Sequence, residues 1–325
     1  MADLAGRLLA GERSAVPDAL NLVDDRRPER REAALLLLDA LERGGRGPGA
    51  PRVGLTGSPG AGKSTLLDAL VRRLRTRGTS VGIVAVDPSS QLSGGALLGD
   101  RVRVRSGAGD PGVFFRSMAA RERLGGLADA TRASVTILAA VFDRVFVETV
   151  GVGQSETEVA ALVDTVVYVA QPGAGDTLQF MKAGILEHPD VFVVNKADRG
   201  PSAERSATEL QAGLGLGVRS GDWRPPVLLA SARDATGIDE ILDALEAHRE
   251  FLERSGELAR RRRRGCEVAV RQALLARYGS HGLECLGREA SVSDRLGGEP
   301  EVSSFARILS LGREIEDALR KPEGC

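Results

Sequence analysis

The sequence predicts an α/β fold in which a mostly parallel central sheet is flanked by helices. A helical segment is expected before this domain and a helical arm after it. Short Val-rich runs alternate with helix-length segments between residues 52 and 231, which is typical of a parallel sheet buried on both faces. Apolar residues recur at helical spacing in both end regions. A glycine-rich turn follows the first run, and such sheets bind ligands at the carboxyl ends of their strands.

Composition limits the classes of protein that the chain can represent. Its 325 residues carry a formal net charge of -1, so no overall field attracts nucleic acid or an anionic membrane. Three scattered cysteines without metal-ligand spacing favour a reducing compartment: Cys266, Cys285 and Cys325. No export signal is visible, and no apolar run approaches the roughly 18 residues of a membrane span. We therefore expect a cytoplasmic protein that binds neither nucleic acid nor membrane.

Three regions follow one another along the chain. Residues 1–46 carry apolar positions at helical spacing, interrupted by two prolines, so we expect about three helices there. A glycine- and proline-rich hinge leads into the sheet domain, residues 50–250. Residues 251–325 are expected to form a helical arm. The arginine run at 260–264 within this arm is either a solvated helix face or a surface for an acidic partner.

Six apolar runs are the predicted strands of the central domain. They are VGLTG at 53–57, SVGIVAVD at 80–87, RVFVET at 144–149, TVVYVAQ at 165–171, VFVVNK at 191–196 and PVLLAS at 226–231. Most of them end in residues that can do chemistry, among them Asp87, Glu148 and Asn195. Because parallel strands present their carboxyl ends at one edge of the sheet, we expect these side chains to share one site.

The segment after the first strand has the pattern GxxxxGK[ST] of a phosphate-binding loop. In this pattern backbone N–H groups surround the phosphates, the lysine reaches the terminal ones and the hydroxyl binds Mg²⁺. Glycines let the backbone approach the anion, and the helix that follows adds its positive end. The predicted nucleotide-binding residues are Gly57, Ser58, Pro59, Gly60, Ala61, Gly62, Lys63, Ser64 and Thr65, and Lys63 is also a predicted catalytic residue.

The residues after the run VFVVN match guanine. Asp198 can accept the ring N–H and the exocyclic amino group of guanine as a bidentate pair, which adenine does not present. Asn195 can reach the N7 and O6 edge of the base or tie this loop to the phosphate loop, and the stem of Lys196 can cover the ring. Backbone N–H groups of a later loop are expected near the base oxygen: Ser231, Ala232 and Arg233. We therefore expect GTP and GDP as ligands.

Oxygen ligands for Mg²⁺ are expected near the phosphate loop, because Mg²⁺ prefers oxygen and keeps several of its waters. The predicted ligands, direct or through water, are Ser64, Asp87, Asp100 and Glu148. Glu148 opens the segment ETVGVGQSE, in which the N–H of Gly151 can contact a γ-phosphate. This segment is expected to order with GTP and to relax after hydrolysis.

The same segment predicts slow intrinsic hydrolysis that a partner stimulates. Small GTPases place a water-orienting glutamine directly after this glycine, whereas here Val152 stands at that place and Gln154 follows two residues later. Gln154, Glu148 or a residue of another subunit remain the candidates for positioning the water. The glycine-rich loop at 171–182 is either an ordinary connection or a third switch.

Six stretches, in this order and spacing, resemble the methylmalonyl-CoA mutase-associated GTPases of the MeaB/ArgK type, which are P-loop GTPases of the SIMIBI class. The stretches are VGLTGSPGAGKSTL, VDPSSQLSGGALLGDR, FFRSMAARERLGGLA, ETVGVGQSE, QPGAGDTLQFMKAGILE and VVNKAD, and the resemblance covers about residues 1–255. It implies a homodimeric GTPase that chaperones an adenosylcobalamin-dependent acyl-CoA mutase, gating cofactor loading and protecting the mutase. It also implies that 171–182 is a partner-sensing switch and that the arm mediates dimerisation.

The chain departs from the family pattern at three places. Gln91-Leu92-Ser93 stands where a Pro-Phe-Thr type of sequence is expected, and Arg121-Glu122-Arg123 lacks a glycine usual before Leu-Gly-Gly. The tail after residue 265 is atypical, which leaves the dimer arm open. The family's older assignment as a kinase for a periplasmic amino-acid-binding protein has little support, because no residue resembles a dedicated phosphoacceptor site.

Two other functions remain as alternatives. A metal-delivery GTPase of the nickel-insertion type usually carries histidine or cysteine clusters, whereas the three histidines here are scattered: His188, His248 and His281. A scaffold that binds nucleotide without hydrolysis would not need Lys63, Ser64 and Glu148. The leading expectation is therefore a GTPase with Mg²⁺ that acts on a mutase.

Overall fold

The computed structural model describes residues 2–25, 27–44, 49–88, 109–120, 127–149, 159–173, 189–216, 222–287, 295 and 302–320. Tertiary contacts divide the chain into two compact units. The sheet unit consists of Pro51–Ala120 and Asp143–Ala259, and the helical unit consists of Met1–Ala50, Arg121–Phe142 and Arg260–Cys325. The helical unit thus combines both end regions of the chain with one segment from its middle.

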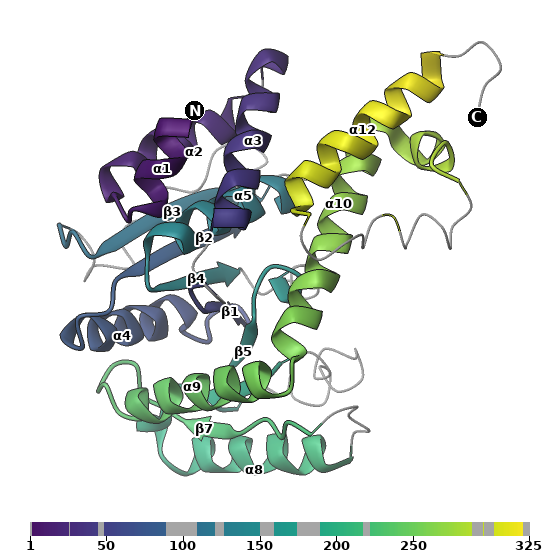
Figure 1. Cartoon of the computed structure of the whole chain (residues 1–325). Coiled ribbons are helices and arrows are strands. Elements are labelled where there is room, and N and C mark those ends of the chain that lie inside the picture. The colour runs from purple at the N-terminus through teal and green to yellow at the C-terminus, as the bar shows by residue number, and fades with distance from the viewer. Residues whose placement is uncertain are drawn as a thin grey trace. The chain divides into compact units, whose positions relative to one another are not determined.

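The sheet unit contains a seven-stranded sheet in the order β3-β2-β4-β1-β5-β6-β7, in which all neighbouring strands are parallel (Figure 1). The strands are β1 (Arg52–Thr56), β2 (Val81–Pro88), β3 (Val113–Ala120), β4 (Arg144–Thr149), β5 (Thr165–Ala170), β6 (Val191–Val194) and β7 (Val227–Leu229). Strand order reverses at β1, because β2 to β4 lie on one side of it and β5 to β7 on the other. In open α/β sheets ligands bind beyond the carboxyl ends at such a reversal.

The predicted α/β fold is confirmed, and all six predicted runs form strands. Strand β3 is an additional strand that the apolar pattern did not predict. It contains Arg116 and Ser117 and is only half-buried over its described side chains, because it lies at the edge of the sheet. An edge strand does not need the continuous apolar run that marks a strand covered on both faces.

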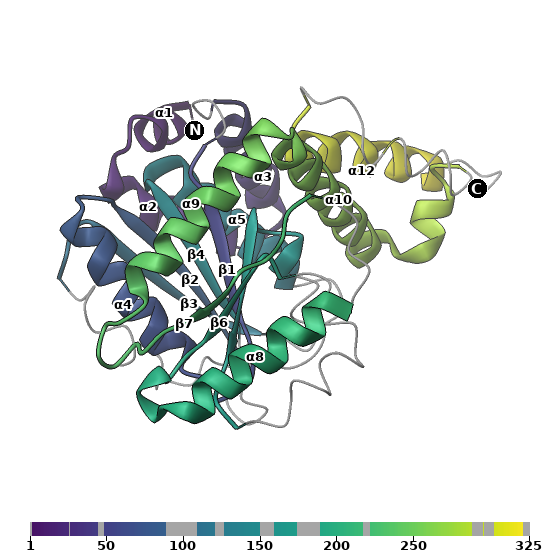
Figure 2. The same cartoon turned by 90° about the horizontal axis from the view of Figure 1, so that it is seen from below.

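Helices cover both faces of this sheet (Figure 2). They are α4 (Lys63–Thr76) and α9 (Ile238–Arg254) on one face and α8 (Pro201–Leu216) on the other. Adjacent residues of β6 show the two layers, because Val193 joins the core with α4 and α9 while Phe192 joins the cluster with α8. The two-sided burial explains why the central strands read as unbroken apolar runs.

The helical unit is built around α3. Its helices are α1 (Ala2–Leu9), α2 (Val16–Asp24), α3 (Pro28–Gly44), α5 (Leu127–Val141), α10 (Glu257–Glu284, most of which belongs to this unit) and α12 (Ser304–Arg320). Helix α3 contacts α1, α2, α5 and α12. The three helices predicted for the N-terminal region are confirmed, with a short 3-10 turn, Arg13–Ala15, between the first two. No helix in the described residues combines the length and apolar content that a membrane span requires.

Candidate nucleotide-binding site

The loop between β1 and α4 is shaped by two glycines. Gly57 has a φ of 135°, and a Cβ added to it would lie 2.1 Å from the backbone oxygen of Val169. Gly62 has a φ of 89°, and its Cβ would lie 2.5 Å from Nδ2 of Asn195. Conformation and space therefore both exclude side chains at these positions. The loop lies directly against β5 and against the residue that follows β6.

Lys63 is the first residue of α4, and its side chain is buried. Its Nζ donates hydrogen bonds to the backbone oxygens of Gly57, at 2.8 Å, and Ser58, at 3.1 Å. The N-cap residue Gly62 provides no side-chain cap, so the positive end of α4 faces the loop without a competing side-chain oxygen. This arrangement suits a phosphate group, which would supply oxygens to both the ammonium and the helix.

Ser64 and Glu148 meet beside this loop. Ser64 Oγ donates a hydrogen bond to Oε1 of Glu148 at 2.5 Å, although the two residues are 84 positions apart. Glu148 lies in β4, aligned with Leu55 of β1, and its side chain is almost fully buried. A hydroxyl and a carboxylate in contact form a donor set of the kind that Mg²⁺ prefers. The residues present therefore fit this ion.

Several residues were predicted to lie near the terminal phosphates of GTP, and the structure describes only some of them. The backbone of Asp87 is the penultimate position of β2, aligned with Ala119 of β3, but its side chain is outside the described set. Asp100, Gly151 and Gln154 lie outside the described residues altogether. Among the side chains that are described, no group of three or more His, Cys, Asp and Glu residues is placed to hold a metal.

Asn195 fastens the phosphate loop to the loop after β7. Its Nδ2 donates to the backbone oxygen of Ala61 at 2.9 Å, and its Oδ1 accepts from the backbone N–H of Ala232 at 3.1 Å. The side chain is buried, with 2% of its surface exposed. Of the two roles that the sequence left open for Asn195, the structure contains the tie between loops. Neither polar atom of its amide is directed to solvent.

Lys196 makes a second link, between the phosphate loop and the end of β5. Its backbone is left-handed, with a φ of 62°, which is uncommon for a residue other than glycine. Its Nζ donates to the backbone oxygen of Gly60 at 2.7 Å and to Oε1 of Gln171 at 2.9 Å. Gln171 opens the glycine-rich segment 171–182, of which residues 174–182 are outside the described part. One ammonium group therefore connects two loops of the site.

Asp198 lies exposed in the 3-10 turn Ala197–Arg199, near the loop that begins at Ser231. Ser231 Oγ lies 2.9 Å from Oδ1 of Asp198 and 3.1 Å from Oδ2 of Asp234. A hydroxyl has one proton, so it donates to only one of these carboxylates at a time. Paired backbone hydrogen bonds between Ser231 and Thr236, at 3.1 and 3.2 Å, close the loop.

One residue of this network, Asp234, and one contact, between Gln171 and Lys196, were not predicted from the sequence. Asp234 shares the Ser231 hydroxyl with Asp198, and its backbone N–H also donates to Ser231 Oγ at 3.2 Å. A serine followed three residues later by an aspartate is typical of such a turn and could have indicated it. The contact of Gln171 with Lys196 has no comparable local signal, because the two residues meet only through the neighbouring strands β5 and β6.

Comparison with known proteins gives one consistent result. The family model for methylmalonyl-CoA mutase-associated GTPase MeaB matches residues 16–280. A Pyrococcus abyssi protein that carries GTPase in its name is 45% identical over 273 residues, covering 83% of this chain and 82% of that protein. The mouse mitochondrial methylmalonic aciduria type A homolog is 38% identical over 267 residues, covering 78% of this chain and 64% of that protein.

A solved structure agrees with these sequence matches. The crystal structure of LAO/AO transport system kinase superposes with a TM-score of 0.69 at 30% identity and covers 97% of each chain. The family model spans most of this chain, including β1, the phosphate loop and the residues after β6. The chain therefore belongs to the MeaB family of methylmalonyl-CoA mutase-associated GTPases.

Proposed function

We propose that this GTPase is a chaperone for an adenosylcobalamin-dependent acyl-CoA mutase of the methylmalonyl-CoA mutase type, gating cofactor loading and protecting the mutase. The family match over residues 16–280 is the observation that carries the proposal. The mouse relative, whose name refers to methylmalonic aciduria, agrees with a partner of this substrate class. A homodimer formed through the arm at 251–325 and a cytoplasmic location are parts of the same proposal.

In the proposed GTP complex the phosphate loop holds the phosphates. The ammonium of Lys63 exchanges the carbonyl oxygens of Gly57 and Ser58 for phosphate oxygens, to which it is better matched in charge. The remaining predicted contacts are backbone N–H groups from Ser58 to Thr65. Because Lys63 is already held in the loop, little side-chain ordering is required when the nucleotide binds.

The metal-binding role falls to Ser64 and Glu148, with Asp87 and Asp100 as further proposed ligands. The Ser64 hydroxyl and the Glu148 carboxylate, which are hydrogen-bonded to each other here, would hold the ion directly or through water. Mg²⁺ bound there would neutralise charge that develops on the β- and γ-phosphate oxygens. Gly151 is proposed to contact the γ-phosphate, and Gln154, Glu148 or a residue of a second subunit to orient the attacking water.

We propose that Asp198 recognises guanine, because its carboxylate lies in an exposed turn. Ser231 would orient its carboxylate through the 2.9 Å hydrogen bond, while Ala232 and Arg233 offer backbone N–H groups near the base oxygen. Asn195 acts indirectly in this proposal, since its amide is already used to hold the loops together. Lys196 combines a stem that covers the base with an ammonium that reaches Gln171.

The contact between Lys196 and Gln171 also supports a switch role for the segment 171–182. A change in the phosphate loop at Gly60 or at the base can reach Gln171 through a single side chain. The GTP-bound and GDP-bound forms would then differ at the segment that a mutase touches. An order change of this kind is how GTPase switches communicate with partners.

The proposal is tested by GTP turnover in the presence of purified mutases. We expect a methylmalonyl-CoA mutase type enzyme to accelerate phosphate release, and this protein to change the transfer of adenosylcobalamin to that mutase in a GTP-dependent way. The Lys63→Ala variant is the matched control, because it should respond to no mutase. If candidate acyl-CoA mutases alter neither turnover nor cofactor transfer, the chaperone function is wrong. If the neighbouring reading frame encodes a mutase, that mutase is the first candidate partner to test.

The alternative of a nickel-delivery GTPase has no observation in the described residues that favours it. His248 is fully buried and shares a hydrogen bond with Thr165. The side chain of His281 lies beside that of Glu284 at the exposed end of α10. Stoichiometric and tight binding of nickel between two subunits would support this alternative over the mutase chaperone. Equilibrium dialysis with nickel, in the presence and absence of GTP, distinguishes the two functions.

A further inference from the structure

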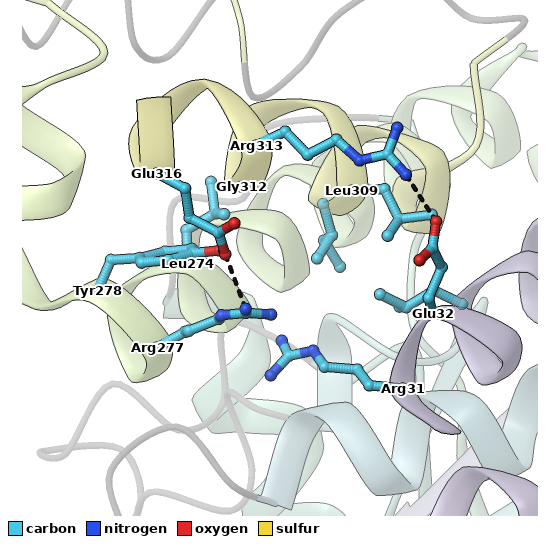
Figure 3. A pocket seen from close by; sticks show the side chains of 11 residues that line it. Arg31, Glu32, Leu274, Arg277, Tyr278, Leu309, Gly312, Arg313 and Glu316 are labelled. Atoms are coloured by element: carbon cyan, nitrogen blue, oxygen red, sulfur yellow. Dashed lines mark hydrogen bonds and ion pairs between the residues drawn. The ribbon is translucent and has the colours of Figure 1, made fainter. Parts of the chain in front are cut away.

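Two arginines at a pocket between α3, α10 and α12 have carboxylate partners on a neighbouring helix (Figure 3). Arg313 of α12 donates to Oε1 of Glu32 on α3 at 2.6 Å. Arg277 of α10 and the hydroxyl of Tyr278 both donate to Oε1 of Glu316 on α12, at 2.7 Å. The charges of these two arginines are therefore balanced within the helical unit. Another arginine of this unit is placed differently.

Arg132 of α5 is buried, with 6% of the residue exposed, and no Asp or Glu pairs with it in the described part of the chain. Arg144 and Arg249 are buried to a similar degree, but they pair with Glu246 and Asp164. An arginine keeps its positive charge in proteins. Because a buried charge without an opposite charge is costly, a negative group next to Arg132 would be stabilising.

The guanidinium of Arg132 is directed at two residues of α10. Its Nη1 donates to the backbone oxygen of Gly265 at 3.1 Å, and its Nη2 donates to Sγ of Cys266 at 3.0 Å. Its Nε–H is buried and has no hydrogen-bond partner among the described residues. Nε–H and one N–H of Nη2 point in the same direction, which lets arginine bind two oxygens in parallel. The sulfur occupies one position of this fork, beside a donor that is not used.

Cys266 is the group that can supply the negative charge. Its thiol is free and the residue is partly exposed, so a small reagent can reach it. The thiolate is the reactive form of cysteine, and a neighbouring arginine favours that form. Oxidation places oxygen atoms on the sulfur. An oxygen bound to Sγ would lie beside the Nε–H of Arg132 and accept its hydrogen bond.

We propose that Cys266 is a site of oxidation by hydrogen peroxide, and that Arg132 holds the oxidised, anionic side chain. The thiolate sulfur attacks one peroxide oxygen, so that an S–O bond forms and the O–O bond breaks. The leaving hydroxide takes the proton of the new S–OH group, which gives a sulfenate and water. A second peroxide converts the sulfenate to a sulfinate and again releases water. Each step oxidises the sulfur by two electrons and reduces one peroxide.

The sulfinate suits this position because it carries one negative charge on two oxygens, as a carboxylate does. Its oxygens accept from Nε and Nη2 of Arg132 in parallel. The product therefore adds a charge-assisted contact between α5 and α10, at residues 134 positions apart in the chain. Arg132, Gly265 and Cys266 all belong to the helical unit, and none of them is part of the nucleotide site.

Peptide mass spectrometry of the full-length protein measures the reaction. The reduced protein is treated with hydrogen peroxide, and the remaining thiol of Cys266 is alkylated and quantified. We expect this thiol to be lost at least about tenfold faster in the folded protein than in the same protein unfolded in urea. The peptide that contains Cys266 should gain two oxygen atoms. A thiol loss no faster in the folded protein, or a peptide without added oxygen, would overturn the proposal.

Two variants separate the contact with Arg132 from the general charge of α10. Arg132→Gln removes the charge that contacts the sulfur, so the thiol should be lost roughly tenfold more slowly. Arg263→Gln is the matched control, because it removes an exposed arginine three residues before Cys266, one that pairs with Glu267. It should react like the unmodified protein, as should Lys63→Ala, so this proposal and the GTPase proposal fail independently. Equal rates in Arg132→Gln and Arg263→Gln contradict the role of Arg132.

A further comparison does not depend on reaction rates and guards against a folding defect in Arg132→Gln. Asp and Asn have nearly the same size and similar helix propensities, and they differ in charge. The Cys266→Asp variant places a carboxylate next to Arg132, so it should melt about 2–4 °C higher than the Cys266→Asn variant. Circular dichroism measures both melting temperatures. If the Cys266→Asn variant melts at the same temperature or higher, Arg132 does not hold an anion at this position and the proposal is wrong.

Discussion

Polar side chains lie at both ends of the parallel strands, but their contacts differ between the two ends. The amino ends of the strands together are called the amino edge, and the carboxyl ends the carboxyl edge. At the amino edge, an aspartate directly before a strand accepts an N–H from the start of the neighbouring strand. Asp143 accepts from Ser80 at 2.8 Å, Asp164 from Arg52 at 3.0 Å and Asp190 from Val166 at 2.9 Å. The three aspartates precede β4, β5 and β6, and they cap β2, β1 and β5. This edge is closed by contacts within the protein.

The carboxyl edge instead holds groups in contacts that a ligand can replace. Lys63 is bonded to loop carbonyl oxygens, and Ser64 is bonded to Glu148. In the proposed GTP complex a phosphate and a metal ion would be better partners for these groups than the protein is. Buried polar residues are therefore not by themselves signs of function. What matters is whether their partners are permanent parts of the fold or can be exchanged.

The strongest test of this difference is Lys63→Ala. We expect GTP turnover to fall by about 10²- to 10³-fold, because a positioned charge at the terminal phosphates is lost. The free energy of unfolding without nucleotide should change little, since the two hydrogen bonds of Lys63 to Gly57 and Ser58 lie within the loop next to it. Turnover is measured by phosphate release and stability by urea unfolding. A large loss of stability with normal turnover would reverse the assignment of this edge.

The matching test at the amino edge is Asp164→Ala. The carboxylate also pairs with Arg249 at 3.3 Å, and both side chains are buried, so the change leaves a buried guanidinium with fewer partners. We expect a loss of about 3 kcal/mol in the free energy of unfolding, with normal GTP turnover per folded molecule. Urea unfolding provides the measurement.

Asp239→Ala is the control for Asp164→Ala. Asp239 pairs with Arg73 and Arg77 on an exposed surface, where such pairs contribute little. Its removal should lower the free energy of unfolding far less than Asp164→Ala does. If both aspartate variants cost the same free energy of unfolding, the amino edge has no special structural role.

A smaller effect is expected for Asp198→Asn, which tests the base loop. An amide at this position offers a donor where guanine also offers donors, so preference should shift toward xanthine nucleotides by roughly tenfold to a hundredfold. Competition binding with GDP and xanthosine diphosphate measures the shift. Asp234→Asn changes the other partner of Ser231 and should keep the preference for guanine. Unchanged GDP affinity in Asp198→Asn removes Asp198 from the base site.

The smallest effect is expected for Lys196→Met, which keeps the stem and removes the ammonium. Two hydrogen bonds, to Gly60 and Gln171, are lost. Because this side chain is half-exposed, we expect GDP affinity to fall by only about five- to tenfold. Stimulation of turnover by a mutase should fall further than basal turnover if the link to Gln171 carries the switch. An equal fall in both would limit Lys196 to nucleotide binding.

Local patterns in the sequence were sufficient for most of the fold and for the residue types of the site. Apolar runs predicted six of the seven strands, and five of these are buried on both faces and therefore need apolar residues at nearly every position. The sixth, β7, is a half-buried edge strand that nevertheless has a short apolar run. Apolar runs did not predict β3, whose half-buried side chains carry no such pattern. The aspartates of the amino edge were also missed, because a carboxylate before a strand looks like any turn residue until its neighbouring strand is known.

Local sequence patterns were enough to predict the parallel sheet, the phosphate loop and the residues after β6 that are expected to bind guanine, because these depend on short-range periodicity and on residue chemistry. The partners of those residues became visible only in the folded protein. It gave Asn195 the role of joining two loops, brought Gln171 to Lys196, and grouped helix α5 with both ends of the chain. These contacts join residues that are distant in sequence, and their geometry depends on strand order and helix packing, which no local pattern contains.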